Sequence, residues 1–502
     1  MRKRTLATAV AVASASLMGG LAPVAVAAPE QAKPVSKAAK PASDFNGDGY
    51  RDLVVAQYGA SVTGTWETGA VAVLYGSKTG VSAAKRQVIT QDTPGIPGTA
   101  ERSDRFGSQA AAGDYDGDGF TDLAISASGE DITFGTTYRR NAGQTTIVWG
   151  GRNGLTKHGA VTVKQTTPTG PDVRRGSSLV AGDFNGDGKT DLATGDYSTG
   201  RGGEVLYGPI GRTTGKAKSV INLGLKDGQP FVHTALDTGD VTGDGITDLV
   251  IQVFSGRAGL SHRIEIHRGT SKGLVRAGHL TGADGKPLFS GIPDDQEVAV
   301  GDLDKDGHAD IAVGQDAYRD GKAWKVSVVY GGKTGQSTRP VQVINQETDP
   351  LPTEDMAHVG ASVDIDDING DGYGDLAIGT ADESFDGVER AGQVLTLPGG
   401  PKGATRDGAR VYHQGTEGVP GDPTRYEYFG TVVKLADLNG DKRADLVTSV
   451  GSGLESHNGR IFVLPATKDG AHTGTGSLSY VATDLGLSDQ SVRSGFGQDF
   501  GK

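Results

Sequence analysis

The chain has 502 residues, of which 80 are glycine and 35 % are hydrophobic, and its formal net charge is −12. Glycine at about twice its usual share of roughly 7 % favours many short strands joined by turns and argues against a helical bundle. The acidic balance does not indicate a nucleic-acid-binding surface. Because the chain has no cysteine, neither a disulfide nor a lipid-modified cysteine can stabilise or anchor it.

Residues 1–27 have the layout of a cleaved secretory signal peptide. Arg2, Lys3 and Arg4 give a basic start, an apolar run follows, and 25–27 supply the small residues of a cleavage site. A membrane anchor is the alternative, but serine, glycine and proline interrupt the run, and no second apolar segment of about 20 residues follows. We therefore expect a secreted, extracellular protein without a membrane span. A Pro/Ala/Lys-rich linker over 28–43 should precede a folded domain over 44–502.

An acidic segment, first seen as "DFNGDGYRDL" at 44–53, occurs seven times along the folded domain. Successive copies begin 57 to 70 residues apart. The first residues of the copies are Asp44, Asp114, Asp183, Asp240, Asp302, Asp367 and Asp437. Self-similarity at such a period predicts a propeller, a solenoid or an array.

Each repeat also carries four apolar pieces that are expected to be strands. A continuous apolar run follows the acidic segment, as at 122–127 and 375–380, and predicts a buried strand. Alternating pieces that end in a turn come next, at 69–76, 143–150, 203–208, 326–331 and 392–399. Third pieces lie at 85–91, 159–165 and 339–346, and pieces leading into the next acidic segment lie at 105–114 and 428–437. Four antiparallel strands per repeat predict an all-β fold, a seven-bladed β-propeller of four-stranded antiparallel blades.

The first repeat lacks the strand that precedes the acidic segment in the others. Near the C-terminus, Phe496-Gly497 aligns with Phe106-Gly107 and Phe429-Gly430. We therefore expect the C-terminal strand to pair into the first blade and close the ring, which removes its open edges. An open array with a frayed C-terminal strand is the alternative.

The acidic segments place oxygen donors at positions 1, 3, 5 and 9, and the backbone carbonyl of position 7 can supply another. This spacing resembles the start of an EF-hand loop, but the glutamate that an EF-hand needs at position 12 is absent from every copy. Turns without metal are the alternative, although clustered carboxylates without a cation would repel one another. We predict up to seven calcium ions, each in the hairpin between the first and second strands of a blade. Magnesium fits less well because it demands stricter octahedral geometry.

The predicted ligands are the residues at these five positions of each loop, with position 7 acting through its carbonyl. They are Asp44, Asn46, Asp48, Tyr50 and Asp52; Asp114, Asp116, Asp118, Phe120 and Asp122; Asp183, Asn185, Asp187, Lys189 and Asp191; Asp240, Thr242, Asp244, Ile246 and Asp248; Asp302, Asp304, Asp306, His308 and Asp310; Asp367, Asn369, Asp371, Tyr373 and Asp375; Asp437, Asn439, Asp441, Arg443 and Asp445. Thr242 replaces an acid or amide, and Lys442 replaces the glycine at position 6. The fourth and seventh loops should therefore bind calcium most weakly.

The combination of an upstream "FG" pair, the acidic loop and a following apolar strand resembles the FG-GAP repeats of the integrin alpha-subunit propeller and of secreted bacterial relatives. The resemblance covers about 44–502. It implies a seven-bladed propeller with calcium in the hairpin loops and ligand binding or adhesion as the activity. The FG pair is degenerate at 175–176, 232–233, 294–295 and 359–360, and no inserted domain interrupts the repeats. An integrin's receptor function is therefore not implied.

The long loops between the other strands should lie on the face opposite the acidic loops, where a rigid scaffold can present binding residues. The candidate ligand-binding residues there are Trp66, Phe134, Tyr138, Arg139, Phe385, Tyr426 and Tyr428. The alternative is that these loops are variable and solvated, with their aromatic side chains packed locally.

No catalytic constellation is visible in the sequence. The G-x-S-x-G match at 269–273 coincides with the repeat's own turn, whereas a nucleophile elbow needs a strand-to-helix turn. We therefore expect a monomeric, non-enzymatic binding or adhesion module for an extracellular glycan or protein. A calcium-stabilised carbohydrate-active enzyme, either a polysaccharide lyase or a hydrolase, is one alternative, and a structural cell-wall component is another.

Overall fold

The computed structural model describes residues 43–164, 171–196, 203–223, 231–255, 263–288, 298–315, 325–345, 362–451, 459–472, 476–487 and 495–502. These residues all belong to one unit, 40–502. The predicted signal peptide and all but the last residue of the predicted linker lie outside the described residues, as do the degenerate pairs at 294–295 and 359–360.

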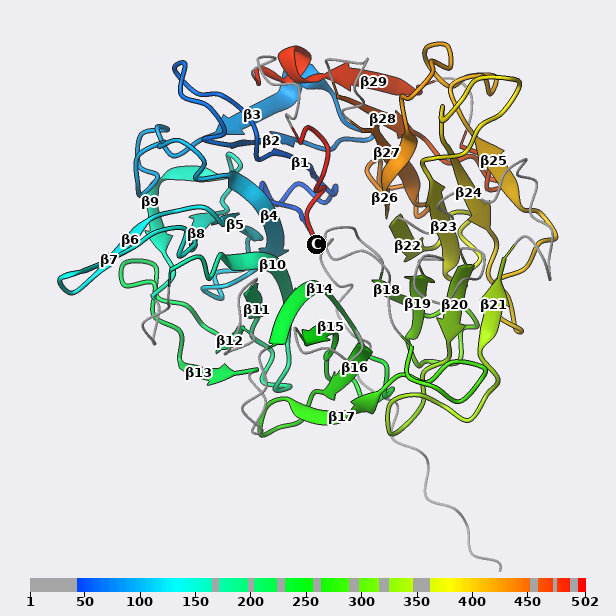
Figure 1. Cartoon of the computed structure of the whole chain (residues 1–502), viewed down its shortest axis with the longest axis horizontal. Helices are drawn as coiled ribbons and strands as arrows, with labels where there is room; N and C mark the ends of the chain where they lie inside the picture. The colour runs from blue at the N-terminus through cyan, green and yellow to red at the C-terminus, as the bar shows by residue number, and fades with distance from the viewer. Residues whose placement is uncertain are drawn as a thin grey trace, which may run out of the picture. The chain divides into compact units, whose positions relative to one another are not determined.

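Within this unit, seven antiparallel sheets follow one another around a central axis as a seven-bladed β-propeller (Figure 1). Six of the sheets have four strands each, and the first has three. Neighbouring strands within each blade are antiparallel. The all-β, seven-bladed fold predicted from the repeat is confirmed.

The first blade holds β1 (Leu53–Gln57), β2 (Ala70–Leu74) and β3 (Arg86–Ile89). The second holds β4 (Phe106–Gly113), β5 (Asp122–Ala127), β8 (Gln144–Trp149) and β9 (Thr156–Thr162), and the third holds β10 (Arg175–Gly182), β11 (Asp191–Asp196), β12 (Glu204–Tyr207) and β13 (Ser219–Asn222). The fourth holds β14 (Phe231–Gly239), β15 (Asp248–Ser255), β16 (Arg263–Arg268) and β17 (Val275–His279). The fifth holds β18 (Val298–Gly301), β19 (Asp310–Gln315), β20 (Lys325–Val329) and β21 (Gln342–Ile344). The sixth holds β22 (Ser362–Asp366), β23 (Asp375–Thr380), β24 (Gln393–Leu397) and β25 (Arg410–Tyr412), and the seventh holds β26 (Phe429–Ala436), β27 (Asp445–Val450), β28 (Arg460–Leu464) and β29 (Leu478–Val481).

The second and third strands of a blade are its most buried parts. Every residue of the second strands β5, β11, β23 and β27 is buried, as is every residue of the third strands β12 and β24. Burial on both faces explains why β5 and β23 read as continuous apolar runs. The predicted runs at 122–127 and 375–380 coincide with β5 and β23. Outer strands such as β13 and β17 are largely exposed. The core is therefore made between blades rather than within one.

The first and last blades pack against each other. One buried cluster joins Leu53 and Ala72 of the first blade to Val447 and Ile461 of the seventh, and it includes Phe496. Apolar contacts between blades thus continue across the place where the chain's first and last blades meet.

The C-terminal residues lie beside β1 (Figure 1). Phe496 pairs with Gln57, the last residue of β1, just as Phe106 and Phe429 pair with the last residues of β5 and β27. The Ala56 N–H donates to the Asp499 carbonyl at 3.0 Å. These contacts support closure of the ring by a C-terminal strand. The sheet of the first blade nevertheless has three strands, so the closure stays a prediction.

Two features were not expected from the sequence. The long loop after β5 contains a small hairpin of β6 (Ile132–Phe134) and β7 (Thr137–Arg139), which projects outward from the second blade (Figure 1). The helices in the described part of the chain are the short 3-10 turns η1 (Ala83–Lys85) and η2 (Ala482–Leu485). Neither of these helices has the length to cross a bilayer.

Candidate metal centres

In the second to seventh blades the acidic loop connects the first and second strands, as expected, and in the first blade it leads directly into β1. The first aspartate of each loop organises the turn. Asp44 Oδ1 accepts the N–H groups of Gly47 at 2.7 Å and Asp48 at 3.1 Å, while its Oδ2 accepts that of Gly49 at 2.9 Å. The Oδ2 contact recurs at the first aspartate of all seven loops. The seven loops therefore share one backbone conformation.

Positions 4 and 6 of the loops require a left-handed backbone. In the first loop these are Gly47, with φ of 71°, and Gly49, with φ of 93°. Lysine takes the same conformation twice, as Lys305 at position 4 and Lys442 at position 6, with φ of 59° and 67°. Because this region costs a non-glycine residue about 1 to 2 kcal/mol, both lysines are strained. The sequence drew attention to Lys442 but not to Lys305.

The ninth-position aspartate ties each loop to a neighbouring turn. In the first loop, Asp52 Oδ2 accepts the Phe45 N–H at 2.9 Å and its Oδ1 accepts the Gly76 N–H at 2.8 Å. Gly76 belongs to the turn between β2 and β3. The equivalent tie to a turn is present in all seven blades. The acidic loops and these turns therefore share one face of the propeller.

Burial perturbs these ninth-position carboxyls. Desolvation raises the pKa of Asp52, Asp310 and Asp375 to about 7, although hydrogen bonds from the backbone oppose the rise. The pKa values of Asp191 and Asp445 also rise to about 7 for the same reason. The pKa of Asp122 rises to about 8, and that of Asp248 rises in the same direction. Without a cation, the ionised form of each loop is thus disfavoured.

Neighbouring loops contact each other around the ring. Where position 4 of a loop is glycine, the side chain at position 7 of the next loop lies over it. A Cβ on Gly47 would meet the Phe120 ring at 2.8 Å, and one on Gly440 would meet the Tyr50 ring at 2.9 Å. The second of these contacts joins the seventh loop to the first. Glycine at position 4 therefore serves both the turn and the close approach of the next loop.

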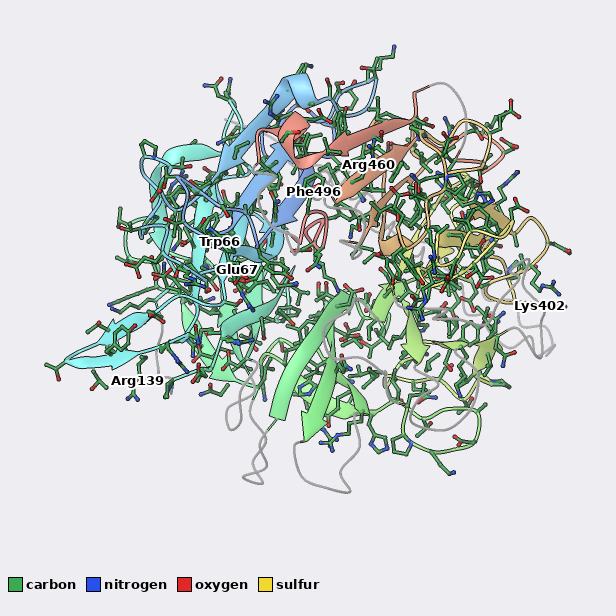
Figure 2. All side chains as sticks on the ribbon, turned by 45° about the horizontal axis from the view of Figure 1, so that its top comes forward. Trp66, Glu67, Arg139, Lys402, Arg460 and Phe496 are labelled. Atoms are coloured by element: carbon green, nitrogen blue, oxygen red, sulfur yellow. The ribbon has the colours of Figure 1, made fainter. Side chains whose placement is uncertain are left out.

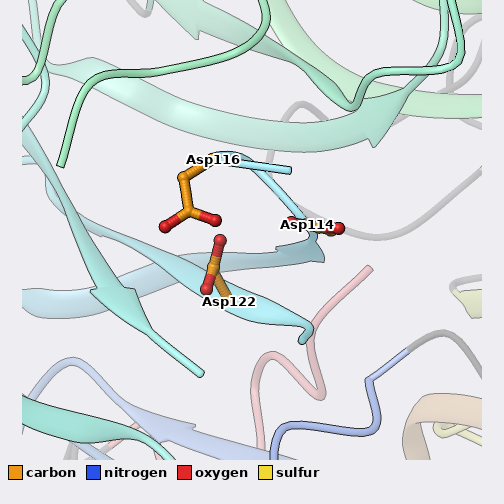
Figure 3. A group of neighbouring side chains, drawn as sticks. All are labelled: Asp114, Asp116 and Asp122. Atoms are coloured by element: carbon orange, nitrogen blue, oxygen red, sulfur yellow. The ribbon is translucent and has the colours of Figure 1, made fainter. Parts of the chain in front are cut away.

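The donor set fits calcium, because the predicted ligands offer only oxygen atoms. Carboxylate oxygens of Asp114, Asp116 and Asp122 gather within 4.8 Å of one another, with the groups of Asp116 and Asp122 facing each other (Figure 3). The same grouping occurs in the fifth loop, at 302, 304 and 310. A carboxylate oxygen that accepts one N–H keeps a second lone pair, so the ninth-position ties leave room for a cation.

Cationic side chains also reach several loops. Arg212 Nη1 lies 2.7 Å from an oxygen of both Asp116 and Asp118, and the Arg212 guanidinium stacks over Trp149. Arg339 pairs with Asp304 in the fifth loop. The two loops with aspartate at position 3 are therefore the two in which an arginine reaches that position.

The candidate ligand-binding residues differ widely in exposure, and Figure 2 labels Trp66 and Arg139 among them. Trp66 is 62 % exposed in the loop between β1 and β2, and Tyr138 and Phe134 of the β6–β7 hairpin are 63 % and 40 % exposed. Arg139 lies on the same hairpin (Figure 2). Phe385, in contrast, is 7 % exposed, so the expectation of an accessible ring is wrong there.

The reason for the difference at Phe385 is local packing, since its ring lies 3.9 Å from that of His413. Tyr426 and Tyr428 are partly buried, with stacked rings 6.4 Å apart. The Tyr426 hydroxyl donates to Glu389 Oε1 at 2.8 Å. These two tyrosines are therefore held in place by contacts within the protein.

Comparison with known families matches the FG-GAP repeat at residues 106–148, 175–206, 296–329 and 359–397, and an FG-GAP-like repeat at 44–125. The chain contains FG-GAP repeats. Integrin alpha pat-2 of Caenorhabditis briggsae is 28 % identical to this chain over 45 % of the chain and 19 % of its own length. Phosphatidylinositol-glycan-specific phospholipase D of Bos taurus is 32 % identical over 32 % of the chain and 18 % of its own length.

The chain thus spans about a fifth or less of the length of these curated relatives. Among solved structures, a Dos1 propeller overlaps 79 % of this chain and 78 % of its own, with 9 % identity and a TM-score of 0.36.

Proposed function

We propose that this FG-GAP propeller is a secreted calcium-binding module whose long loops bind an extracellular glycan or protein, in adhesion rather than catalysis. The observation that carries the proposal is the repetition of one oxygen-lined loop geometry seven times on a single face. The other face is left to loops of variable length, which carry the exposed side chains of Trp66 and Tyr138. Such a division suits a rigid scaffold that presents a binding surface.

In this proposal the side chains at positions 1, 3, 5 and 9 and the carbonyl at position 7 hold the ion. A bound calcium ion would supply positive charge among carboxylates that otherwise repel one another. The ninth-position aspartate links the loop to the following turn, so calcium binding would restrict the motion of both the loop and the turn at that edge of the blade. Calcium is thus structural here, and it acts on the face opposite the ligand.

Removal of calcium tests the structural role. Sites of the extracellular type, with Kd near 10⁻⁴ to 10⁻³ M, each stabilise by only about 1 kcal/mol at millimolar calcium, but seven of them add up. We expect EDTA to lower the melting temperature markedly and added calcium to restore it. An unchanged melting curve in EDTA would show that calcium has no structural role.

A glycan array, probed with calcium and then with EDTA, tests the binding function. Binding of one sugar class that is lost in EDTA would support a lectin-like module, while a blank array would favour a protein ligand. Turnover of a polysaccharide by the purified protein would instead favour the carbohydrate-active enzyme, and retention in washed wall fractions would favour a structural wall component.

A further inference from the structure

A cavity of about 360 Å³ lies over the second blade, on the long-loop face of the propeller. It opens where the segment before β4, the β6–β7 hairpin and the segment before β10 come together. Four arginines line it: Arg102, Arg105, Arg140 and Arg174. Asp131 is the one acidic residue in the lining. In a chain with a net charge of −12, four guanidinium groups gather around this one cavity.

The acid in the lining is already used to hold the loops. Asp131 Oδ1 accepts the Asn141 N–H at 2.7 Å, and its Oδ2 accepts the Tyr138 hydroxyl. Behind the lining, Asp104 and Glu130 are desolvated, which raises their pKa values to about 6 and 7. These acids therefore carry less negative charge than their number suggests.

Two carboxylates outside the lining form ion pairs with its arginines. Glu67 lies 3.8 Å from Arg105, and Asp172 lies 3.3 Å from Arg140. Ion pairs as exposed as these are weak, so both guanidinium groups keep donors for another anion. Arg102 is exposed on the rim.

The backbone beneath the arginines is fixed by contacts between blades. The Arg105 N–H donates to the Glu67 carbonyl at 3.1 Å, and the Arg174 N–H donates to the Asn141 carbonyl at 2.9 Å. The same contact recurs between Tyr428 and Arg390 in the seventh blade, so the backbone geometry belongs to the repeat. At this cavity both positions are arginine, with Arg105 before β4 and Arg174 before β10. The fixed backbone lowers the entropy cost of binding.

The chemistry of the lining selects the ligand. A guanidinium matches a carboxylate or sulfate group with paired hydrogen bonds, and the remaining lining side chains, Ser103 and Asn141, are polar. No aliphatic or aromatic side chain lines this cavity within the part of the chain that the structure describes. A ligand that is polar on all sides and anionic at one point fits better than an apolar or peptide side chain. The volume is in the range of small-molecule sites.

Aromatic rings extend the surface beyond the cavity. The carbonyl of Trp66 accepts the Ser103 N–H at 3.2 Å, and the Tyr138 hydroxyl bonds to Asp131. Both side chains are more than 60 % exposed. They offer flat apolar surface next to the charged cavity, which suits a polymer that continues past its bound unit.

We propose that this cavity binds one acidic sugar unit of a polyanionic glycan, with the arginine side chains holding its carboxylate or sulfate group. The proposal rests on the binding function proposed above and names the class of its ligand. Carboxylated and sulfated glycans share this chemistry, so the experiment must separate them.

The test measures binding of polygalacturonate, dextran sulfate, poly-glutamate and neutral dextran to the purified protein in calcium. The variant is Arg102→Gln/Arg174→Gln. The matched control is Arg152→Gln, because Arg152 is an exposed arginine in the turn between β8 and β9, on the metal face. We expect one polyanion to bind, the double variant to weaken its affinity by about tenfold or more, and the control to leave it unchanged. Whichever polyanion binds identifies the acidic group.

Three results would overturn the inference. These are no binding of either polyanion, equal binding by the wild type and the double variant, and poly-glutamate binding that matches the glycan and is lost in the same variant. If a neutral glycan binds, and the double variant binds it as the wild type does, this inference is wrong while the proposed function stands. If the double variant melts at a lower temperature than the wild type, Arg102→Gln alone decides, because its side chain lies on the exposed rim.

Discussion

At the scale of single residues, two lysines stand where the loop geometry favours glycine. Lys442 has a φ of 67°, yet its N–H still donates to Asp437 Oδ2 at 2.8 Å, as the glycine N–H does in the other loops. The loop conformation is thus kept at the expense of strain. The seventh loop therefore differs from the others in energy rather than in shape.

Replacing Lys442 with glycine should stabilise the protein and raise the calcium affinity of the seventh loop. The substitution removes the cost of about 1 to 2 kcal/mol that a non-glycine residue incurs in the left-handed conformation. The greater conformational freedom of glycine in the unfolded chain partly offsets this gain in stability. Melting curves with and without calcium measure the gain. Lys305→Gly is the comparison variant. It loses the hydrogen bond from Lys305 Nζ to the Asp371 carbonyl, so its melting temperature should rise less than that of Lys442→Gly. A lower melting temperature for Lys442→Gly would contradict the strain.

Arg212 is a second residue-scale determinant, because its guanidinium occupies the position of a competing cation in the second loop. Arg212→Gln should raise the calcium affinity of that loop by removing the charge between Asp116 and Asp118. Calcium titration of the variant, followed calorimetrically, measures this, with Arg152→Gln as a control for the loss of one exposed positive charge. Unchanged or weaker binding in Arg212→Gln would show that the arginine does not compete.

At the scale of elements, the loop and the turn form one hydrogen-bonded unit. The sequence predicted that the ninth-position aspartate is a metal ligand, whereas the structure shows its carboxylate accepting two backbone N–H groups, as that of Asp375 does from Ile368 and Gly399. The sequence signal for this second role is the glycine that ends the alternating strand after the aspartate, at 76 and 399. The two roles of the aspartate can be separated by comparing positions in one loop.

Asp375→Ala should lower the melting temperature in EDTA as well as in calcium, because it leaves a buried and a partly buried N–H group without acceptors. A buried N–H that loses its acceptor costs about 1 to 3 kcal/mol. Asp371→Ala removes an exposed side chain of the same loop and should lower the melting temperature mainly in calcium. Thermal melts of both variants in the two buffers make the comparison. Equal melting temperatures of the two variants in EDTA would mean that the hydrogen bonds from the backbone to Asp375 contribute little to stability.

Strands were predicted correctly where their burial gives the sequence a recognisable apolar pattern, and they were missed where it does not. The strands at 122–127 and 375–380 could be read from the sequence because both faces of each strand are buried. The β6–β7 hairpin is short and mostly exposed, so no alternation marks it. Phe385 shows the converse case, because nothing local to the sequence reveals that His413, from the loop after the next strands, covers its ring.

At the scale of the whole molecule, seven similar carboxyls titrate in the same direction. Burial raises the pKa of most ninth-position aspartates from 3.8 to about 7 or 8. A folded-state pKa above the unfolded value gives stability that is present below the unfolded pKa and is lost as the pH rises through the folded one. The metal-free protein should therefore lose stability between about pH 4 and pH 8.

Melting temperatures across this pH range, with EDTA and with calcium, check that expectation. In EDTA the melting temperature should fall as the pH rises, because each buried carboxyl must then ionise without a partner. In calcium the fall should be much smaller, since the ion favours the ionised form. A melting temperature in EDTA that rises steadily from pH 4 to pH 8 would contradict the assignment of these groups.

The contacts between neighbouring loops have a consequence for how the ions would be taken up. Tyr50 rests on Gly440 in the same way that Phe120 rests on Gly47, so the series of loops has neither a first nor a last member. An ion that orders one loop also orders the surface on which the next loop rests. Calcium uptake should therefore be cooperative between neighbours, and a Hill coefficient above one in a calcium titration would be the sign of a circular chain of sites that fill together.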